Sequence, residues 1–146
     1  MRILPPALVA LCVAMMAVLH LAVPEPAVVA GSARWLGLLA IVGGASLTVA
    51  AARLFKRRRA NINTFKTPTA LVTDGPFRVS RNPIYLGFTV LLVGAAVVLG
   101  SALPFAVAAA FAVIADRWYI PFEERAMRAE FGAAFDAYAQ RVRRWL

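Results

Sequence analysis

Four apolar runs divide the chain, and each approaches the length of a membrane span. They cover roughly residues 3–23, 35–54, 84–99 and 103–120. A helix needs about 20 residues to cross ~30 Å of hydrocarbon, and at this chain length only helices leave no backbone polar group unpaired in lipid. Because only residues 100–102 separate the last two runs, we expect these runs to form a tight antiparallel helical hairpin.

The apolar period changes after the fourth run. From Met127 to Trp145, large apolar residues recur every three or four positions and would share one face of a helix, while most charged residues lie off that face. This pattern predicts an amphipathic helix that lies in the headgroup region of a membrane.

Together these patterns predict an all-α integral membrane fold with four transmembrane helices and a C-terminal amphipathic interfacial helix. The chain would form a single membrane domain over residues 1–146. Its expected parts are two N-terminal spans in 1–54, a cytosolic loop in 55–83, the transmembrane hairpin in 84–120 and the interfacial helix in 121–146.

The composition supports a membrane location. The chain is 62% hydrophobic and only 16% charged, and its mean hydropathy is +0.74. Average soluble chains carry about 45–50% apolar and about 25% charged residues. A chain this small has too high a surface-to-volume ratio to hide such an excess inside a globule. The surplus apolar surface must therefore face lipid.

Basic residues collect at the ends of the apolar runs and indicate an orientation. The segment from Arg53 to Arg81 carries eight Lys or Arg residues and one acid, Asp74, whereas the first connection has only Glu25 and Arg34. An excess of Lys and Arg marks the cytosolic side of a membrane protein. Both termini and the candidate site are therefore expected in the cytoplasm, and the arginine- and alanine-rich composition favours a bacterial inner membrane.

The net charge of +9 could also suggest nucleic-acid binding. Basic residues at span ends more often contact anionic headgroups, so nucleic acid is not an expected partner. A second alternative makes the first run a signal peptide, with Arg2 before it and a small-residue cleavage site at 27–30. That run exceeds the usual length of about 7–15 residues for such a segment, so a retained span is favoured.

The residues that commonly bind metals are nearly absent. Cys12 and His20 are the only cysteine and histidine, and each lies in or near an apolar run. A single chain can therefore form no disulfide and no zinc site of the His/Cys type. We expect no metal, and we expect His20 to be a packed, hydrogen-bonded residue.

The third run begins with a motif that carries polar groups. Pro83 suits the first helical turn, where a missing N–H costs nothing, and Asn82 suits the N-cap. The simplest interpretation is a helix start beside a topology-setting arginine. In the functional interpretation, the helix N-terminus and Arg81 bind an anion, with the guanidinium gripping a carboxylate. Tyr85 follows one turn later, where it could stack or donate a hydrogen bond.

Two adjacent acids, Glu123 and Glu124, follow the fourth run. In one interpretation Glu124 pairs with Arg128 within the helix, for a few tenths of a kcal/mol. In the other, the two carboxylates bind ribose hydroxyls, an ammonium or a sulfonium. Asp116 and Arg117 lie inside the end of the same run, where charges are costly. They are either functional or reach the interface.

Residues 81–85, the apolar hairpin and Glu123-Glu124 resemble, in this order, the Arg-His-Pro-x-Tyr … Glu-Glu signature of membrane methyltransferases. The family is that of isoprenylcysteine carboxyl methyltransferase and the related phospholipid N-methyltransferases. The resemblance continues upstream through residues 71–78 and downstream through Phe131-Gly132 to Tyr138 and Arg141, so that it covers about the last 75 residues.

The resemblance implies S-adenosylmethionine as the cofactor, bound at the cytosolic membrane face, and a lipophilic or lipid acceptor that approaches from the bilayer between helices. The cofactor-binding residues that it implies are Arg81, Asn82, Pro83, Tyr85, Glu123 and Glu124. The eukaryotic enzymes have His where this chain has Asn82. Asn can donate a hydrogen bond but does not titrate near neutral pH, so we expect Asn82 to contact the cofactor rather than act as a base.

Four residues are candidates for a part in catalysis. Arg117 could hold an anionic acceptor, as could Arg78. Glu123 or Glu124 could act as the base for an amine acceptor, whereas a carboxylate acceptor needs no base. Since the sulfonium is already an activated methyl donor, alignment of donor and acceptor supplies most of the catalysis.

Two other functions stay open at this stage. An NADPH-dependent enzyme of the sterol-reductase type would have a similar C-terminal hairpin, but it would need more spans and more phosphate-binding groups. A small four-helix transporter or structural protein would place polar groups at mid-membrane, whereas here they collect at one face. The acceptor, the atom methylated and the oligomeric state are undetermined, because glycines such as Gly37, Gly43, Gly44 and Gly94 permit close helix packing within or between chains.

Overall fold

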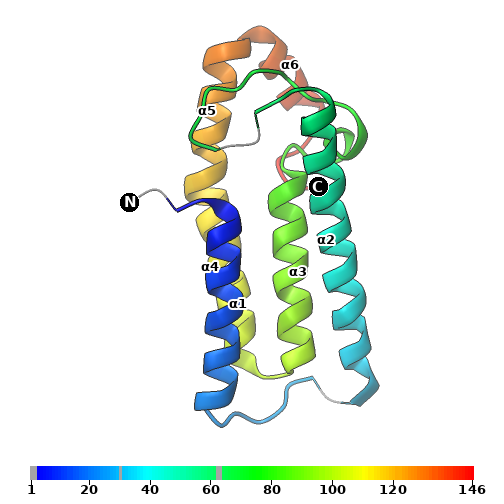
Figure 1. The fold of residues 1–146 in the computed structure, drawn as a ribbon, viewed down its shortest axis with the longest axis vertical. Coiled ribbons are helices and arrows are strands. Elements are labelled where there is room, and N and C mark those ends of the chain that lie inside the picture. Colours follow the sequence, from blue (N-terminus) through cyan, green and yellow to red (C-terminus); the bar gives the residue numbers. More distant parts are fainter. Residues whose placement is uncertain (1–2, 30, 62–63) are drawn as a thin grey trace.

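The computed structural model describes residues 3–29, 31–61 and 64–146, and in these ranges it consists of helices and loops without a strand. Four helices form the long bundle of Figure 1: α1 (Pro5–Ala22), α2 (Arg34–Arg57), α3 (Pro83–Leu99) and α4 (Ala102–Ile114). At one end of the bundle, α5 (Ile120–Phe131), α6 (Ala133–Arg141) and the loop between α2 and α3 form a region that we call the head.

Three helices are long and apolar enough to cross a membrane, over Pro5–Ala22, Gly31–Arg57 and Ala102–Phe131. The apolar helix α3 is shorter, at 17 residues. The expected membrane fold is thus confirmed as an all-helical fold with three candidate spans. A fourth span at α3 and an interfacial tail helix stay predictions. Two residues of the signal-peptide alternative, Arg2 and Ala30, lie outside the described residues.

Two pairs of glycines allow α2 and α3 to lie against each other. A Cβ atom on Gly44 would lie 2.5 Å from the carbonyl oxygen of Gly87, and one on Gly37 would lie 2.6 Å from that of Gly94. Close packing by Gly37, Gly44 and Gly94 therefore occurs within the chain, and Gly87 is the partner of Gly44. A Cβ on Gly43, by contrast, would meet open space.

The apolar core of the bundle lies where α1 and α4 meet α3. Met16 of α1, Leu92 of α3 and Phe111 of α4 are at most 1% exposed. The start of α1 is fixed to the head side of α4, because the Tyr119 hydroxyl donates to the carbonyl of Ile3 at 2.8 Å. This contact brings the first residues of α1 to the end of the bundle where the polar motifs lie.

At the far end of the bundle, Gly100 and Ser101 join α3 to α4. Gly100 has a φ of +79°, in the left-handed region that glycine adopts without strain at a helix end. Its carbonyl accepts bonds from the N–H groups of Val28 and Val29 at 2.8 and 3.1 Å. His20 shares a hydrogen bond with Ser101 at 2.9 Å, as expected, but it is an exposed residue rather than a packed one.

The helix that begins with α4 continues beyond the fourth apolar run. It passes through a π-helical turn, η3 (Ala115–Tyr119), into α5 and ends at Phe131. Pro121 lacks the N–H for a regular helical bond and its ring crowds the preceding turn, so a wider turn before it is a local solution. Gly132, with a φ of +49°, then separates α5 from α6. The tail predicted as one helix is therefore two.

The apolar face of α6 packs on the protein. Phe135 and Tyr138 are 3% and 4% exposed, and they form a cluster with Ala51 of α2 and with Phe77 of the short helix η2 (Gly75–Arg78). The Tyr138 hydroxyl donates to the carbonyl of Phe77 at 2.7 Å. Burial raises the pKa of Tyr138 to about 12. The head is therefore a packed unit above the bundle.

Candidate active site

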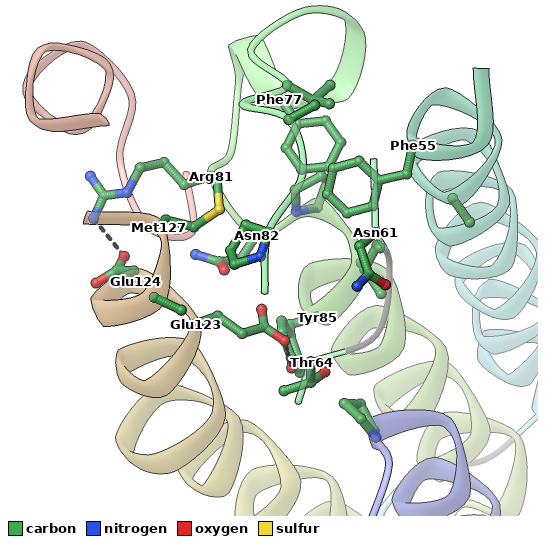
Figure 2. A pocket seen from close by; sticks show the side chains of 18 of the residues that line it. Phe55, Asn61, Thr64, Phe77, Arg81, Asn82, Tyr85, Glu123, Glu124 and Met127 are labelled. Carbon is green, nitrogen blue, oxygen red and sulfur yellow. Dashed lines mark hydrogen bonds and ion pairs between the residues drawn. The ribbon is translucent and has the colours of Figure 1, made fainter. Parts of the chain in front are cut away.

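A cavity of about 400 Å³ lies in the head, between the start of α3, α5 and the α2–α3 loop (Figure 2). Its walls are mainly apolar, and the rings of Phe55 and Phe77 stack in one wall with their centroids 4.9 Å apart. Every residue predicted to bind a cofactor lines this cavity: Arg81, Asn82, Pro83, Tyr85, Glu123 and Glu124. The hairpin of α3 and α4 brings these two groups together from distant parts of the sequence.

The first turn of α3 places Asn82 differently from the prediction. Pro83 opens the helix and Asn82 occupies the N-cap position, but the Asn82 side chain makes no capping bond. Its Nδ2 donates instead to the carbonyl of Arg144 at 3.1 Å. That carbonyl belongs to residues 142–146, which we call the tail segment. Asn82 is therefore a contact between the cavity wall and the tail segment.

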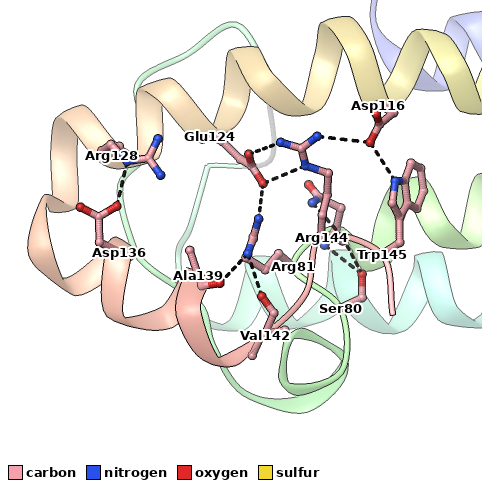
Figure 3. A network of polar contacts seen from close by, with 11 residues as sticks. Ser80, Arg81, Asp116, Glu124, Arg128, Asp136, Ala139, Val142, Arg144 and Trp145 are labelled. Atoms are coloured by element: carbon pink, nitrogen blue, oxygen red, sulfur yellow. Dashed lines mark hydrogen bonds and ion pairs between the residues drawn. The ribbon is translucent and has the colours of Figure 1, made fainter.

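Arg81 is held on three sides. Its Nη1 donates to the carbonyls of Ala139 and Val142, each at 2.7 Å, and its Nη2 donates to Glu124 at 2.9 Å (Figure 3). The side chains of Arg81 and Glu124 are each 14% exposed. The Nε of Arg81 is buried and has no hydrogen-bond partner. The Nε–H of this guanidinium is thus a buried donor that remains to be satisfied.

A second arginine, Arg144 of the tail segment, reaches the same carboxylate. Its Nη2 donates to Glu124 at 2.8 Å, and its Nη1 donates to Asp116 at 3.3 Å (Figure 3). The bond to Glu124 is the main reason why the pKa of Arg144 lies above its ordinary value. Trp145 also donates its indole N–H to Asp116, at 2.9 Å. Glu124 therefore has two cationic partners, and the predicted pairing with Arg128 does not form because Arg128 pairs with Asp136.

Glu123 has a different environment from its neighbour. Tyr85 donates its hydroxyl to Glu123 at 2.8 Å, and Thr64 of the loop hydrogen-bonds to both side chains. Figure 2 shows the Glu123 carboxylate directed toward Tyr85 and Thr64. None of the ion pairs in the described part of the chain includes Glu123. It is thus a carboxylate at the cavity whose hydrogen-bond partners are neutral.

Arg117 and Arg78, the candidate holders of an anionic acceptor, lie apart from this arrangement. The Arg117 side chain is 83% exposed and sits 3.5 Å from Asp116, and Arg78 is exposed. Neither residue lines the cavity. The structure therefore gives Arg117 no contact through which it could act on a molecule in the cavity.

Sequence reasoning missed Thr64, Arg144 and Trp145. Arg144 is one of several arginines near the end of the sequence, and Trp145 ends the apolar face that the sequence predicts there. Neither has a local motif that marks it, because each meets its partner through the fold. Thr64 lies in a loop without periodicity. The only signal for Thr64 in the sequence is its position next to other polar residues of the loop.

Comparison with known proteins gives a family for this site. The model of the phospholipid methyltransferase family matches residues 32–134. The curated relatives include protein-S-isoprenylcysteine O-methyltransferase B of Arabidopsis thaliana, which is 40% identical over 75 residues, covering 49% of this chain and 36% of the relative. The corresponding methyltransferase A is 39% identical over the same length, with the same coverage.

A probable protein-S-isoprenylcysteine O-methyltransferase of Oryza sativa subsp. indica is 37% identical over 75 residues, covering 49% of this chain and 38% of the relative. The alignments thus span little more than a third of these relatives' length. No solved structure matches the chain significantly.

Proposed function

Because the chain belongs to the phospholipid methyltransferase family, we propose that it transfers a methyl group from S-adenosylmethionine to a lipophilic or lipid-like acceptor in the cavity of the head. Family membership favours this activity over the reductase and transport alternatives. The observation that carries the proposal is the contrast between Glu123, which has only neutral partners, and Glu124, which has two arginines.

The residues at the cavity fit this cofactor. A volume of about 400 Å³ lies within the ~300–1,000 Å³ range of small-molecule sites. The free Nε of Arg81 is a donor for a carboxylate. The Glu123 carboxylate suits a sulfonium, an ammonium or a hydroxyl group. The rings of Phe55 and Phe77 and the side chain of Met127 offer apolar surface to a flat base.

S-adenosylmethionine, when bound, supplies a methyl group already activated by its positive sulfur. The chain's own residues then have to bind, orient and exclude water. Tyr85 and Thr64 orient the Glu123 carboxylate, so that it can balance positive charge or accept the proton of an amine acceptor. Glu124 holds Arg81 in place through their ion pair. A base is needed only if the acceptor is an amine.

The apolar part of the cavity suits the acceptor. Pro5 and Pro6 at the start of α1 and Ala52 of α2 line this part, which lies toward the membrane-spanning bundle. A lipophilic acceptor would enter from the bilayer here and place its reactive end near Glu123. Arg117, which does not line the cavity, has no part in this proposal.

We also propose that the head faces the cytosol. Exposed Lys and Arg residues follow α2 within the head, whereas the connection at the other end carries a single arginine, Arg34. The chain would then be one membrane domain with spans in 1–54 and 84–120, a cytosolic loop in 55–83 and a tail in 121–146 at the membrane surface.

Binding of S-adenosylmethionine to the detergent-solubilised protein, measured by titration calorimetry, tests the cofactor. We expect binding to the parent and at least tenfold weaker binding to Glu123→Gln, since a charge-assisted contact contributes about 1.5–3 kcal/mol. Glu130→Gln is the matched control, because Glu130 is an exposed carboxylate on the same helix. Binding of NADPH without binding of S-adenosylmethionine would overturn the proposal.

Transfer itself can be followed with a methyl-labelled donor. The protein is incubated with the labelled S-adenosylmethionine and phospholipid vesicles, and the label extracted into organic solvent is counted. Label that appears in the lipid fraction with the parent, and falls with Glu123→Gln, supports a lipid acceptor. If the parent binds the donor but transfers no label to any phospholipid or lipophilic acid supplied, the acceptor class proposed here is wrong.

A further inference from the structure

We propose that Asn82 and Arg144 hold the tail segment against the wall residues at the polar end of the cavity, and that Arg144 is thereby a positioning residue for Glu124. The tail segment lies beyond residue 134, where the family match ends. The inference deepens the proposed function, on which it rests for the role of Glu124 in the cofactor site. The contacts themselves are independent of that function.

Residues immediately before α3 donate hydrogen bonds to the backbone of the tail segment. The N–H of Arg81 donates to the carbonyl of Arg143 at 2.9 Å. The next carbonyl, that of Arg144, accepts two bonds, from the Ser80 hydroxyl at 3.2 Å and from Asn82 Nδ2 at 3.1 Å. Ser80 and Asn82 are 1% and 8% exposed. Buried donors of this kind are costly to leave unpaired, so the tail segment satisfies groups that the cavity wall cannot satisfy alone.

The side chains of the tail segment bind to residues of η3 and α5. Arg144 bridges Glu124 of α5 and Asp116 of the π-helical turn, and Trp145 donates to the same Asp116. Asp116 is thus the anchor for two consecutive tail residues. The backbone of the tail segment therefore contacts the start of α3 while its side chains contact η3 and α5, and the segment links the two walls that carry the predicted motifs (Figure 3).

The consequence concerns Glu124. Arg81 donates to Oε1 alone, whereas Arg144 reaches both oxygens, Oε2 from Nη2 at 2.8 Å and Oε1 from Nε at 3.4 Å. Without Arg144 the carboxylate would keep one partner and could rotate, and Arg81 would lose its fixed counter-charge. A planar guanidinium can bridge two carboxylates in one geometry, which an ammonium cannot do as well. Arg144 therefore sets the orientation of Glu124, and through it that of Arg81.

This assignment also gives position 82 a role that requires no proton transfer. The Asn82 amide donates to a backbone carbonyl of the tail segment. The N–H of an imidazole could make the same bond, and so Asn and His are interchangeable in this role. A carboxylate is nearly the same size as the amide but has no donor, so Asn82→Asp would place two acceptors face to face.

A spin label on the tail segment tests the proposal without any cofactor. Leu146 is 66% exposed and can carry the label as Leu146→Cys in a Cys12→Ala background, which removes the only native cysteine. We expect the electron paramagnetic resonance spectrum to show a mobile label in Asn82→Asp and Arg144→Gln. In the parent and in Asn82→His we expect an immobile label. Arg143→Gln is the matched control, since its side chain is exposed and makes none of these contacts.

Titration of S-adenosylmethionine into the same set of variants tests the positioning of Glu124. We expect Asn82→Asp and Arg144→Gln to bind at least tenfold more weakly than the parent, while Arg143→Gln binds like the parent. The proposal is overturned if the tail segment stays immobile in both Asn82→Asp and Arg144→Gln, or if it becomes mobile and binding is unchanged. A parent that binds no S-adenosylmethionine, with a tail released in these variants, would refute the proposed function and leave the tail attachment supported.

Discussion

Two consecutive glutamates show how the environment of a side chain decides its role. Successive residues of a helix point about 100° apart, so Glu123 and Glu124 face different neighbours. Glu124 lies between two guanidinium groups, whereas Glu123 accepts hydrogen bonds from hydroxyl groups. A charge that is already neutralised serves to hold structure, and one without a counter-charge is available to a ligand. Glu124 is therefore tied into the structure, and Glu123 is the carboxylate that we propose meets the ligand.

At this scale the sequence allowed part of the site to be predicted. The motifs around Arg81 and Glu123 were enough to predict that both line one pocket, because an apolar hairpin must return to the side from which it started. The contacts of Arg144 and Trp145 could not be predicted, since they depend on the path of the chain after Gly132. The side chain of Asn82 can both donate and accept a hydrogen bond, and the sequence does not indicate which partner it binds.

Tyr138 provides a prediction about pH. Its folded pKa of about 12 lies above the value near 10 of an unfolded tyrosine, so its contribution to stability is complete below pH ~10 and is lost as the pH rises toward 12. The hydroxyl's bond to Phe77 contributes about 1 kcal/mol. Tyr138→Phe should therefore unfold at a lower temperature than the parent at pH 8, and the difference should shrink by pH 11. An equal difference at both pH values in thermal unfolding experiments would contradict this.

Helix packing depends on very few atoms at the α2–α3 contact. The glycines of each helix are spaced seven residues apart, and they meet in antiparallel order, so that the backbones touch at two levels. Small residues are the usual means by which membrane helices approach each other closely. The sequence indicated close packing by Gly37, Gly43, Gly44 and Gly94, but it did not indicate Gly87 or which face of α2 meets α3. That choice is made by the opposing Gly87 and Gly94.

Substitution of adjacent glycines tests this contact. Gly44→Ala would place a methyl group 2.5 Å from the carbonyl oxygen of Gly87, and overpacking of this kind typically costs about 1–3 kcal/mol. Gly43→Ala adds the same methyl group where no atom lies within 4 Å, and Ala is the better helix former. We expect a lower midpoint of thermal unfolding for Gly44→Ala only. Similar midpoints for the two variants would show that α2 packs through a different face.

The ends of the helices were harder to predict than their existence. Three apolar runs are helices long enough to cross a membrane, as length and composition indicated. The helix after Ala102 nevertheless continues past Pro121, which in most helices marks a boundary. A π-helical turn before the proline makes this possible, and no simple period in the sequence announces such a turn.

Charge is distributed unevenly over the whole molecule. Within the described residues, the acids of the head mostly pair with arginines, as Asp74, Asp136 and Glu124 do. Many other cations of the head remain exposed, which leaves its surface strongly basic. The pairs on the surface contribute little to stability. The unpaired Lys and Arg residues have the larger effect, because their excess positive charge lies on the side expected to face the cytosol.

Chemical labelling tests this orientation. In a Cys12→Ala background, Ala129→Cys places a thiol on an exposed position of α5, and Val28→Cys places one at the opposite end of the bundle, where Val28 is 59% exposed. A maleimide that cannot cross membranes should label Ala129→Cys from the cytosolic side only and Val28→Cys from the other side only. The reverse pattern would invert the topology, and labelling of both from one side would rule out a membrane-spanning bundle.

The attachment of the tail segment also has a consequence for how the protein is made. A ribosome releases residues in order, so α2 and α3 can pair through their glycines while later residues are still being added. The ion pairs around Glu124 must wait, because Arg144 is added long after Arg81, the other partner of this carboxylate. Insertion of the bundle into a membrane and completion of these ion pairs are therefore separate events in synthesis. A nascent chain could be fully inserted while Glu124 still lacks one of its two cationic partners.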